Sequence, residues 1–342
     1  MNDATPVIAA KNVWKLFGPQ PEKYLAGMEP GRSFEDIRAD GYIAGVKDVS
    51  ISLTRGEMLV IMGLSGSGKS TLVRCFSRLH DITGGTVEVE GQNIMALTER
   101  ELIDLRRSKM GMVFQSFGLL PHRTVLENVA FPLEMRGQDR HTRRERALEM
   151  IRLVGLDGRE EYFPRELSGG QQQRVGIARS LAIEPDIWFL DEPFSALDPL
   201  IRREMQDEFL RLQGMLGKSI AFITHDFDEA LRLADRIAIM RNGAVEQCDT
   251  PDKIVLNPAT EYVFKFTEDI DKARVVRARG LMQPLNGASP EGAPVDGMAT
   301  IQALARDLVN DPREVIPVAG QDGAVAGQMK RQAALDILLG TR

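Results

Sequence analysis

The sequence is poor in cysteine and contains no long apolar run. Cys75 and Cys248 are the only cysteines among 342 residues, which excludes a disulfide framework and a zinc site and favours a reducing cytosol. No apolar stretch approaches the roughly 20 residues that cross a membrane as a helix. Residues 1–6 contain neither a basic nor an apolar segment, so we expect no signal peptide. Any membrane role must therefore be peripheral.

Positive charge is not in excess either. Lys and Arg number 43 against 49 Asp and Glu, a formal net charge of -6, which argues against a general nucleic-acid binder. Hydrophobic residues make up 43% of the chain, as in ordinary globular proteins. This length predicts one large α/β domain with a small appendage.

Three continuous apolar runs indicate strands buried on both faces. They occupy residues 58–62, 187–190 and 220–223. Segments with helical periodicity separate them, so we expect a mostly parallel sheet covered by helices on both faces. Residues 7–17 predict a short strand. The insert at 18–45 has no clean periodicity and predicts a loop with a short helix.

A glycine-rich loop follows the first of these strands and opens a helix. It reads Gly63-Leu64-Ser65-Gly66-Ser67-Gly68-Lys69-Ser70-Thr71, which fits the phosphate-loop pattern in its required strand–loop–helix context. Gly66 and Gly68 let the backbone N–H groups turn inward around a phosphate. Lys69 is suited to the β- and γ-phosphates, and the Ser70 hydroxyl to Mg²⁺. The loop predicts a nucleoside triphosphate site.

Two acidic residues end the second apolar run. Charge at the carboxyl end of a buried strand must be paired or bind a cation. Asp191 suits the Mg²⁺ shell. Glu192 would point away from the metal and could polarise a water for in-line attack on the γ-phosphate.

A second anion-binding helix start follows at Leu167-Ser168-Gly169-Gly170-Gln171. Ser168 and Gln171 fit a capping box, which is the simpler explanation. Capping does not explain Gly169 and Gly170, which strip side chains from the helix N-terminus. The chain thus carries two phosphate-facing surfaces but one cradling lysine. In a head-to-tail pair of chains, each nucleotide would bind between the phosphate loop of one chain and the capped helix of the other, so both surfaces would contact phosphate.

In their order along the chain, these motifs resemble those of ATP-binding cassette (ABC) ATPases over residues 7–265. Gln115, His225 and the tetrapeptide Ser195-Ala196-Leu197-Asp198 complete the set. The resemblance implies a phosphate-loop cassette with a mostly parallel sheet, N-terminal antiparallel strands and a helical subdomain at about 115–180. It also implies that ATP and Mg²⁺ are the ligands.

The resemblance also assigns roles to individual residues. Gln115 would touch Mg²⁺ and the attacking water, and its loop would sense a membrane partner. Ser195 to Asp198 would form the D-loop, which crosses the dimer interface, and His225 would contact the γ-phosphate. Adenine would stack on an aromatic residue of an early strand, for which we favour Phe17 over Trp14.

Other residues of these chemical types lack such a context. Cys75 lies on the apolar stripe of its helix and is interpreted as an inert buried thiol. The rest are interpreted as surface or structural histidines and as solvated helix charges: His80, His122, His141, Arg202 and Arg203.

Within the family, the chain most resembles ATPase subunits of importers for glycine betaine, proline and choline. The insert at 18–45 and two stretches, Ile61–Arg74 and Val113–His122, carry this likeness. It implies a peripheral protein on the cytoplasmic face of the inner membrane. Its partners would be a second copy, permease subunits and, indirectly, a periplasmic or extracytoplasmic substrate-binding protein, with no nucleic acid. The alternatives are an importer of another amino acid or a polyamine, a soluble cassette ATPase and a non-catalytic nucleotide sensor.

The last part of the chain has a different character. Residues 282–297 predict a linker, and the segment 266–342 resembles a single CBS motif at Ile316-Pro317-Val318 and Gly323-Ala324-Val325-Ala326-Gly327. The resemblance implies a small α/β regulatory or dimerisation unit. A plain helical cap that helps dimerisation is the alternative.

Overall fold

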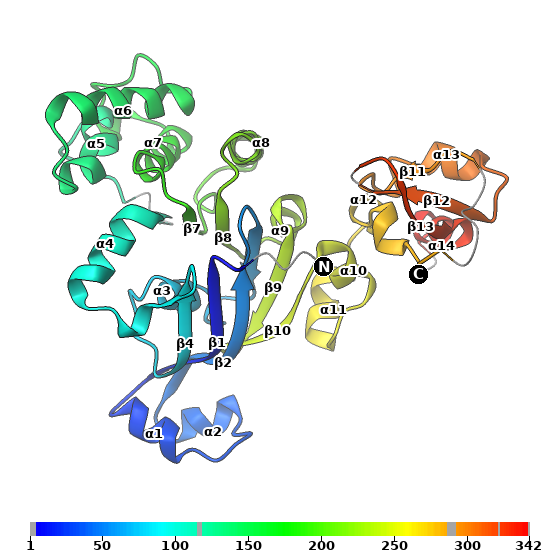
Figure 1. The fold of residues 1–342 in the computed structure, drawn as a ribbon, viewed down its shortest axis with the longest axis horizontal. Helices are drawn as coiled ribbons and strands as arrows, with labels where there is room; N and C mark the ends of the chain where they lie inside the picture. Colours follow the sequence, from blue (N-terminus) through cyan, green and yellow to red (C-terminus); the bar gives the residue numbers. More distant parts are fainter. Residues whose placement is uncertain (1–4, 115–117, 286–291, 321, 341–342) are drawn as a thin grey trace. The chain divides into compact units, whose positions relative to one another are not determined.

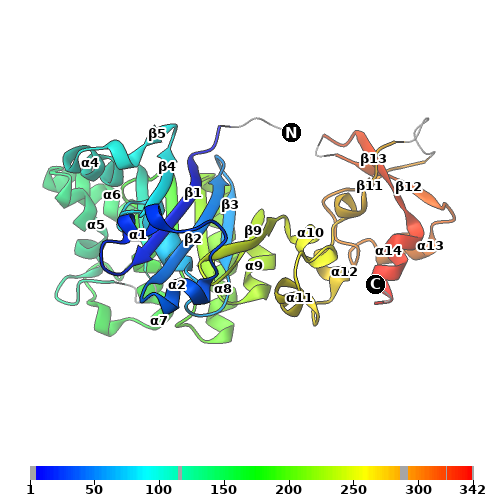
Figure 2. The same cartoon turned by 90° about the horizontal axis from the view of Figure 1, so that it is seen from below.

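The computed structural model describes residues 5–114, 118–285, 292–320 and 322–340. The chain forms two compact units, Met1–Val245 and Glu246–Arg342 (Figures 1 and 2). Within the described residues, no helix is both long enough and apolar enough to span a membrane.

A six-stranded sheet has the order β10-β9-β3-β8-β7-β6. Five of its strands belong to the first unit, and the edge strand β10 contains the boundary between Val245 and Glu246. The pairs from β9 to β6 are parallel, and every residue of β3, β7 and β8 is buried. This confirms the expected parallel sheet. Its strands are β3 (Met58–Met62), β6 (Met110–Val113), β7 (Ile187–Asp191), β8 (Ser219–Thr224), β9 (Arg236–Arg241) and β10 (Ala244–Asp249).

The first unit also contains an antiparallel sheet, in the order β2-β1-β4-β5. Its strands are β1 (Ile8–Phe17), β2 (Ile43–Leu53), β4 (Gly84–Val89) and β5 (Gln92–Asn93). Helix α3 (Lys69–Phe76) contacts β1 and β2 of this sheet and β8 of the other. Its buried residues Leu72, Val73, Cys75 and Phe76 fill the space between them.

The insert after β1 is more ordered than the sequence suggests. It forms two short helices, α1 (Pro21–Gly27) and α2 (Phe34–Ala39), where we expect one. Ile37 of α2 is fully buried and packs with Leu16 and Ala44 of the flanking strands. The rings of Tyr24 and Tyr42 stack at 3.9 Å. The apolar residues of the insert come from two short helices and the loops beside them and pack into one small core. They therefore do not recur at a regular spacing along the sequence.

Three helices of the first unit, α5, α6 and α7, contact one another and form a group (green in Figure 1). The helices of this unit not yet given are α4 (Glu99–Lys109), α5 (Val125–Met135), α6 (Arg140–Leu153), α7 (Gly169–Leu181), α8 (Pro199–Leu216) and α9 (Phe227–Leu233).

The second unit contains a three-stranded sheet, β11-β12-β13. The unit begins before residue 266, because buried Asp252 accepts a hydrogen bond from the Arg277 N–H at 2.8 Å and ties α10 to later residues. Its strands are β11 (Val295–Asp296), β12 (Val315–Ala319) and β13 (Val325–Lys330). Its helices are α10 (Pro251–Leu256), α11 (Glu261–Thr267), α12 (Lys272–Val275), α13 (Ala305–Asn310) and α14 (Arg331–Leu338).

The two cysteines differ in a way that chemical modification can detect. Cys75 is fully buried, and desolvation raises the pKa of its thiol to about 12, whereas Cys248 is partly exposed. We expect a thiol reagent at pH 8 to modify one cysteine in the native protein and both after unfolding, because the thiolate is the reactive form. A Cys248→Ser variant should then show no fast reaction. Two rapidly modified thiols in native protein would contradict the packing of α3.

Candidate functional site

A cleft opens where the central strands end, and we call it the strand-end cleft. Its volume of about 710 Å³ is in the range of small-molecule sites. The residues that line it come from six segments of the first unit. They are Phe17, Phe34, Ile43, Ala44, Gly45, Leu64, Ser65, Gly66, Gly68, Lys69, Ser70, Thr71, Glu192 and His225.

The phosphate loop runs from the end of β3 into α3, as its sequence predicts. Gly68 has φ +104°, and a Cβ there would lie 2.2 Å from the Gly45 carbonyl oxygen, so the loop tolerates no side chain at this position. Lys69 Nζ donates to the carbonyls of Gly63 and Leu64 at 2.8 and 3.1 Å. Burial lowers the pKa of the Lys69 ammonium. The ammonium is therefore held over the loop.

Ser67 has a buried Oγ without a hydrogen-bond partner among the residues that the structure describes. Its side chain does not line the strand-end cleft, and its Oγ lies 2.8 Å from the position that a Cβ on Gly63 would take. The side chain of Ser67 therefore packs behind the loop, whereas Gly66 and Gly68 on either side of it line the cleft.

Ser70 and Asp191 meet next to this loop. Ser70 Oγ donates to Asp191 Oδ1 at 2.9 Å, and desolvation raises the pKa of the Asp191 carboxyl. A hydroxyl and a carboxylate are the oxygen ligands that Mg²⁺ takes when phosphates and water complete its shell. The described residues contain no cluster of three acidic, histidine or cysteine side chains that could hold a metal ion.

Glu192 and His225 lie next to each other in the cleft. Glu192 Oε2 lies 3.2 Å from His225 Nδ1, and Glu192 has φ +47°, a conformation that costs about 1–3 kcal/mol. Three hydrogen bonds hold it there: the Glu192 N–H donates to the Ile223 carbonyl, and the N–H and Oγ of Ser195 donate to the Glu192 carbonyl. The strained backbone aims a carboxylate into the cleft directly after Asp191.

Residues 167–171 form the start of α7. None of them is among the residues that line the strand-end cleft in the described part of the chain. Ser168 and Gln171 form the expected capping box. A Cβ on Gly170 would lie 2.8 Å from Ile201, so packing against α8 explains that glycine. A Cβ on Gly169 would make only an ordinary contact, and the residue is exposed. Gly169 is therefore the glycine that leaves the helix start open.

The tetrapeptide 195–198 lies beside α7, where a Cβ on Gly169 would meet Leu197. Asp198 caps α8 by accepting the Ile201 N–H at 3.1 Å, while Ala196 is exposed. Arg202 is not the solvated helix charge that we expect. Its guanidinium donates to the Leu197 carbonyl at 3.1 Å and reaches Asp226, the neighbour of His225, at 3.5 Å.

The two aromatic residues considered for stacking on adenine lie in different surroundings. Trp14 packs against Leu16, Ile37 and Ala44 of the insert core. Phe17 is 38% exposed and lines the cleft. A Cβ on Gly45 would lie 2.7 Å from the Phe17 ring and 2.9 Å from the Thr71 methyl, so this glycine allows the ring to lie beside the phosphate loop.

Sequence reasoning missed Gly45, Phe34 and Ile43, and no local motif marks them. They reach the cleft because β2 pairs with β1 and the insert folds back on both. Gln115, expected to touch the metal, lies outside the described residues.

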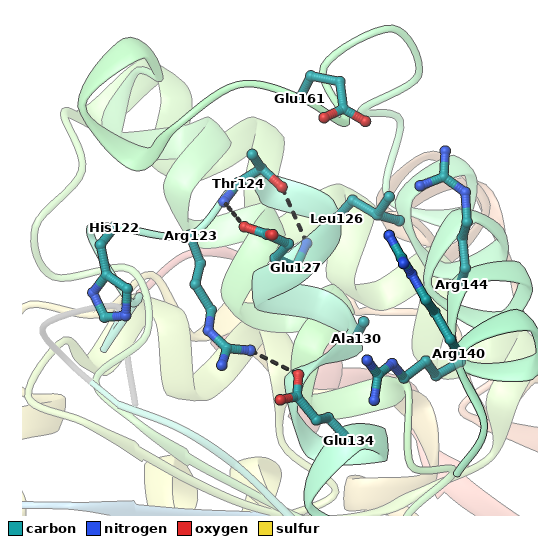
Figure 3. Close-up of a pocket in the computed structure, with 11 residues that line it drawn as sticks. His122, Arg123, Thr124, Leu126, Glu127, Ala130, Glu134, Arg140, Arg144 and Glu161 are labelled. Carbon is teal, nitrogen blue, oxygen red and sulfur yellow. Dashed lines mark hydrogen bonds and ion pairs between the residues drawn. The ribbon is translucent and has the colours of Figure 1, made fainter.

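A second cavity lies on the α5–α6 side of the first unit (Figure 3). Arg123 forms an ion pair with Glu134 at 2.8 Å. Arg140, Arg143 and Arg144 of α6 line the cavity together with Glu127 and Glu161. The lining therefore has mixed charge with a small excess of arginine over glutamate.

Gly45 gives a specific prediction. We expect Gly45→Ala to weaken ATP binding about 5- to 100-fold, because overpacking costs about 1–3 kcal/mol and displaces Phe17 or Thr71. Calorimetric titration with ATP measures this. Gly27→Ala is the control, since nothing lies within 4 Å of its Cβ position. Unchanged ATP affinity in a folded Gly45→Ala variant would contradict this role.

Comparison with known proteins identifies the family. A model described as "ABC transporter" matches residues 46–195. The chain is 77% identical over 335 residues, 98% of each chain, to the trimethylamine N-oxide transport system ATP-binding protein TmoW of Ruegeria pomeroyi. It is 49% identical to the glycine betaine/proline betaine transport system ATP-binding protein ProV of Escherichia coli, over 83% of this chain and 73% of ProV.

A solved structure agrees with the fold of the first unit. It is the dimeric, post-hydrolysis form of the ATP-binding cassette MJ0796 bound to ADP and Pi, with a TM-score of 0.59 and 34% identity, covering 71% of this chain and 98% of that one. The phosphate loop, the acidic pair and the capped α7 thus occur in a shared cassette fold. The chain belongs to the ABC transporter family, as an ATP-binding subunit.

Proposed function

We propose that this chain hydrolyses ATP in a pocket that two copies build together. The observation that carries the proposal is that residues 167–171 form an open, capped helix start outside the cleft that holds Lys69 and Glu192. A helix N-terminus binds anions, and a second copy placed head to tail would bring it to the γ-phosphate. The dimeric form of the relative cassette supports this arrangement.

The polar groups of the cleft then have chemical tasks. The loop N–H groups and Lys69 hold the phosphates. Glu192 accepts a proton from the attacking water, and His225 orients Glu192 and contacts the γ-phosphate. Ser168 and Gly169 of the second copy would stabilise the charge that develops there. Ser195 holds the backbone of Glu192 in its strained conformation.

Ser70 and Asp191 would hold Mg²⁺, with Gln115 as the further ligand that the family resemblance implies. The metal would neutralise charge on the phosphate oxygens. Because Ser70 already donates to Asp191, the two oxygens lie within reach of one ion.

The transported compound is proposed to be trimethylamine N-oxide. The 77% identity to TmoW covers nearly the whole of both chains, against 49% to ProV, so this methylated amine is favoured over glycine betaine. The compound would be recognised by a permease and a binding protein and need not touch this chain. We place the chain on the cytoplasmic face of the membrane. The arginine-bearing cavity of Figure 3 would face the permease.

The second unit is proposed to be one CBS-like regulatory or dimerisation unit. Its β12 and β13 hold the two stretches that resemble a CBS motif and pair antiparallel, and α13 contacts α14. A single copy of the motif would pair across the dimer.

Removing the proposed base tests the hydrolysis step. We expect Glu192→Gln to lower kcat for ATP hydrolysis about 10²- to 10⁴-fold, the usual contribution of a general base, with ATP affinity retained. The variant should also accumulate as an ATP-bound dimer in size-exclusion chromatography. Exposed Glu204 provides the control, and Glu204→Gln should behave as the parent. Equal hydrolysis by Glu192→Gln and the parent would refute the assignment.

Transport tests the proposed compound. We expect trimethylamine N-oxide to stimulate ATP hydrolysis when the chain, its permease and its binding protein are reconstituted in vesicles, and to do so more than glycine betaine. An aromatic cage in the binding protein would favour both compounds over a polyamine, because both carry a trimethylated nitrogen. Discrimination between the two would come from the groups that bind the N-oxide oxygen or the carboxylate. Stimulation by a polyamine instead would overturn the proposal.

A further inference from the structure

One part of the strand-end cleft has no role in holding phosphate. Its lining divides into a polar end, with Lys69, Glu192 and His225, and an apolar end at the insert. The apolar end consists of Phe17 from β1, Phe34 from α2 and Ile43 from β2. Two of these are large apolar side chains left open to solvent, Phe17 at 38% and Ile43 at 62%.

The β1–β2 pairing places two of these side chains together. Phe17 and Ile43 are directly opposite in the antiparallel register, so their side chains lie on the same face of the sheet. Lys15 Nζ lies 5.0 Å from the Phe17 ring centroid, and the His80 ring meets it edge-on at 5.8 Å. Neither Lys15 nor His80 lines the cleft. They hold the Phe17 ring from outside and leave its remaining surface for a ligand.

Phe34 comes from a different element that is fixed independently. It is the first residue of α2, directly after Ser33, whose side chain forms a capping box with Asp36. Ile37, one turn later, is fully buried in the insert core, and Phe34 packs partly against the same core. The core thus holds Phe34 at the cleft before any ligand arrives.

From these positions we infer that Phe34 of the insert, with Ile43, forms a second wall of the nucleotide-base subsite opposite the surface offered by Phe17. The occupant is the purine base of the nucleotide whose phosphates the loop 63–71 holds. The flat apolar faces of a base suit two aromatic side chains, and each base–aromatic stack contributes substantially to binding. The insert is therefore part of the nucleotide site. This inference rests on the proposed function, since it requires ATP in this cleft.

The test compares a nucleotide with its phosphates alone. The affinities of MgATP and of inorganic tripolyphosphate are measured by titration calorimetry on the full chain, for the parent and for Phe34→Ala. We expect Phe34→Ala to weaken ATP binding about 5- to 150-fold, the range of a lost base stack, and to leave tripolyphosphate binding unchanged. Phe34→Trp should restore ATP affinity. Glu35→Ala, at an exposed neighbour on α2, is the matched control and should bind both ligands as the parent does.

The remaining outcomes overturn the inference. Unchanged ATP affinity in Phe34→Ala shows that the base does not use this wall, while ATP binding by the parent leaves the proposed function standing. An equal loss of both ligands shows that Phe34 only supports the fold. If the parent binds tripolyphosphate as tightly as MgATP, the nucleoside adds no affinity and there is no base subsite. A parent that binds neither ligand contradicts the proposed function itself.

Discussion

The register of three parallel strands determines where the chemistry lies. In the pairing of β3 with β8, Met62 is level with Thr224, and in that of β7 with β8, Asp191 is level with Ile223. The residues that follow these ends, Gly63, Glu192 and His225, therefore emerge at one edge of the sheet. A slip of one residue in a strand would turn its terminal side chain to the other face. Every other feature of the cleft is built onto this edge.

The sequence predicted this part of the site well, because its signals are local. A continuous apolar run in the sequence indicates a buried strand. The phosphate loop and the acidic pair each come directly after such a run. The comparisons confirm the cassette fold and the family that these motifs indicate. Parallel strands also end at a common edge, so motifs at their ends could be expected to converge.

Tertiary packing decided what the sequence could not. Gly170 looked like part of an anion receptor, yet its missing side chain is needed for contact with Ile201. Arg202 looked solvated, yet it joins Leu197 to Asp226. The environments of Gly170 and Arg202 depend on how α7, α8 and the segment after β8 pack together. The periodicity of one helix does not show which residues of another element it will contact. The two helices of the insert were underestimated for the same reason, since their apolar residues serve a core formed with distant strands.

The insert and the phosphate loop are mechanically linked through one strand. Gly45 of β2 lies between the Phe17 ring and Thr71, and its carbonyl oxygen faces Gly68. Ala44, its neighbour, belongs to the insert core together with Ile37. A ligand that moved the loop would therefore press on β2 and, through Ala44, on α2. Interiors packed this closely transmit small displacements because there is no space to absorb them. The insert is thus connected by packing to the phosphate loop, and it also lines the apolar end of the cleft.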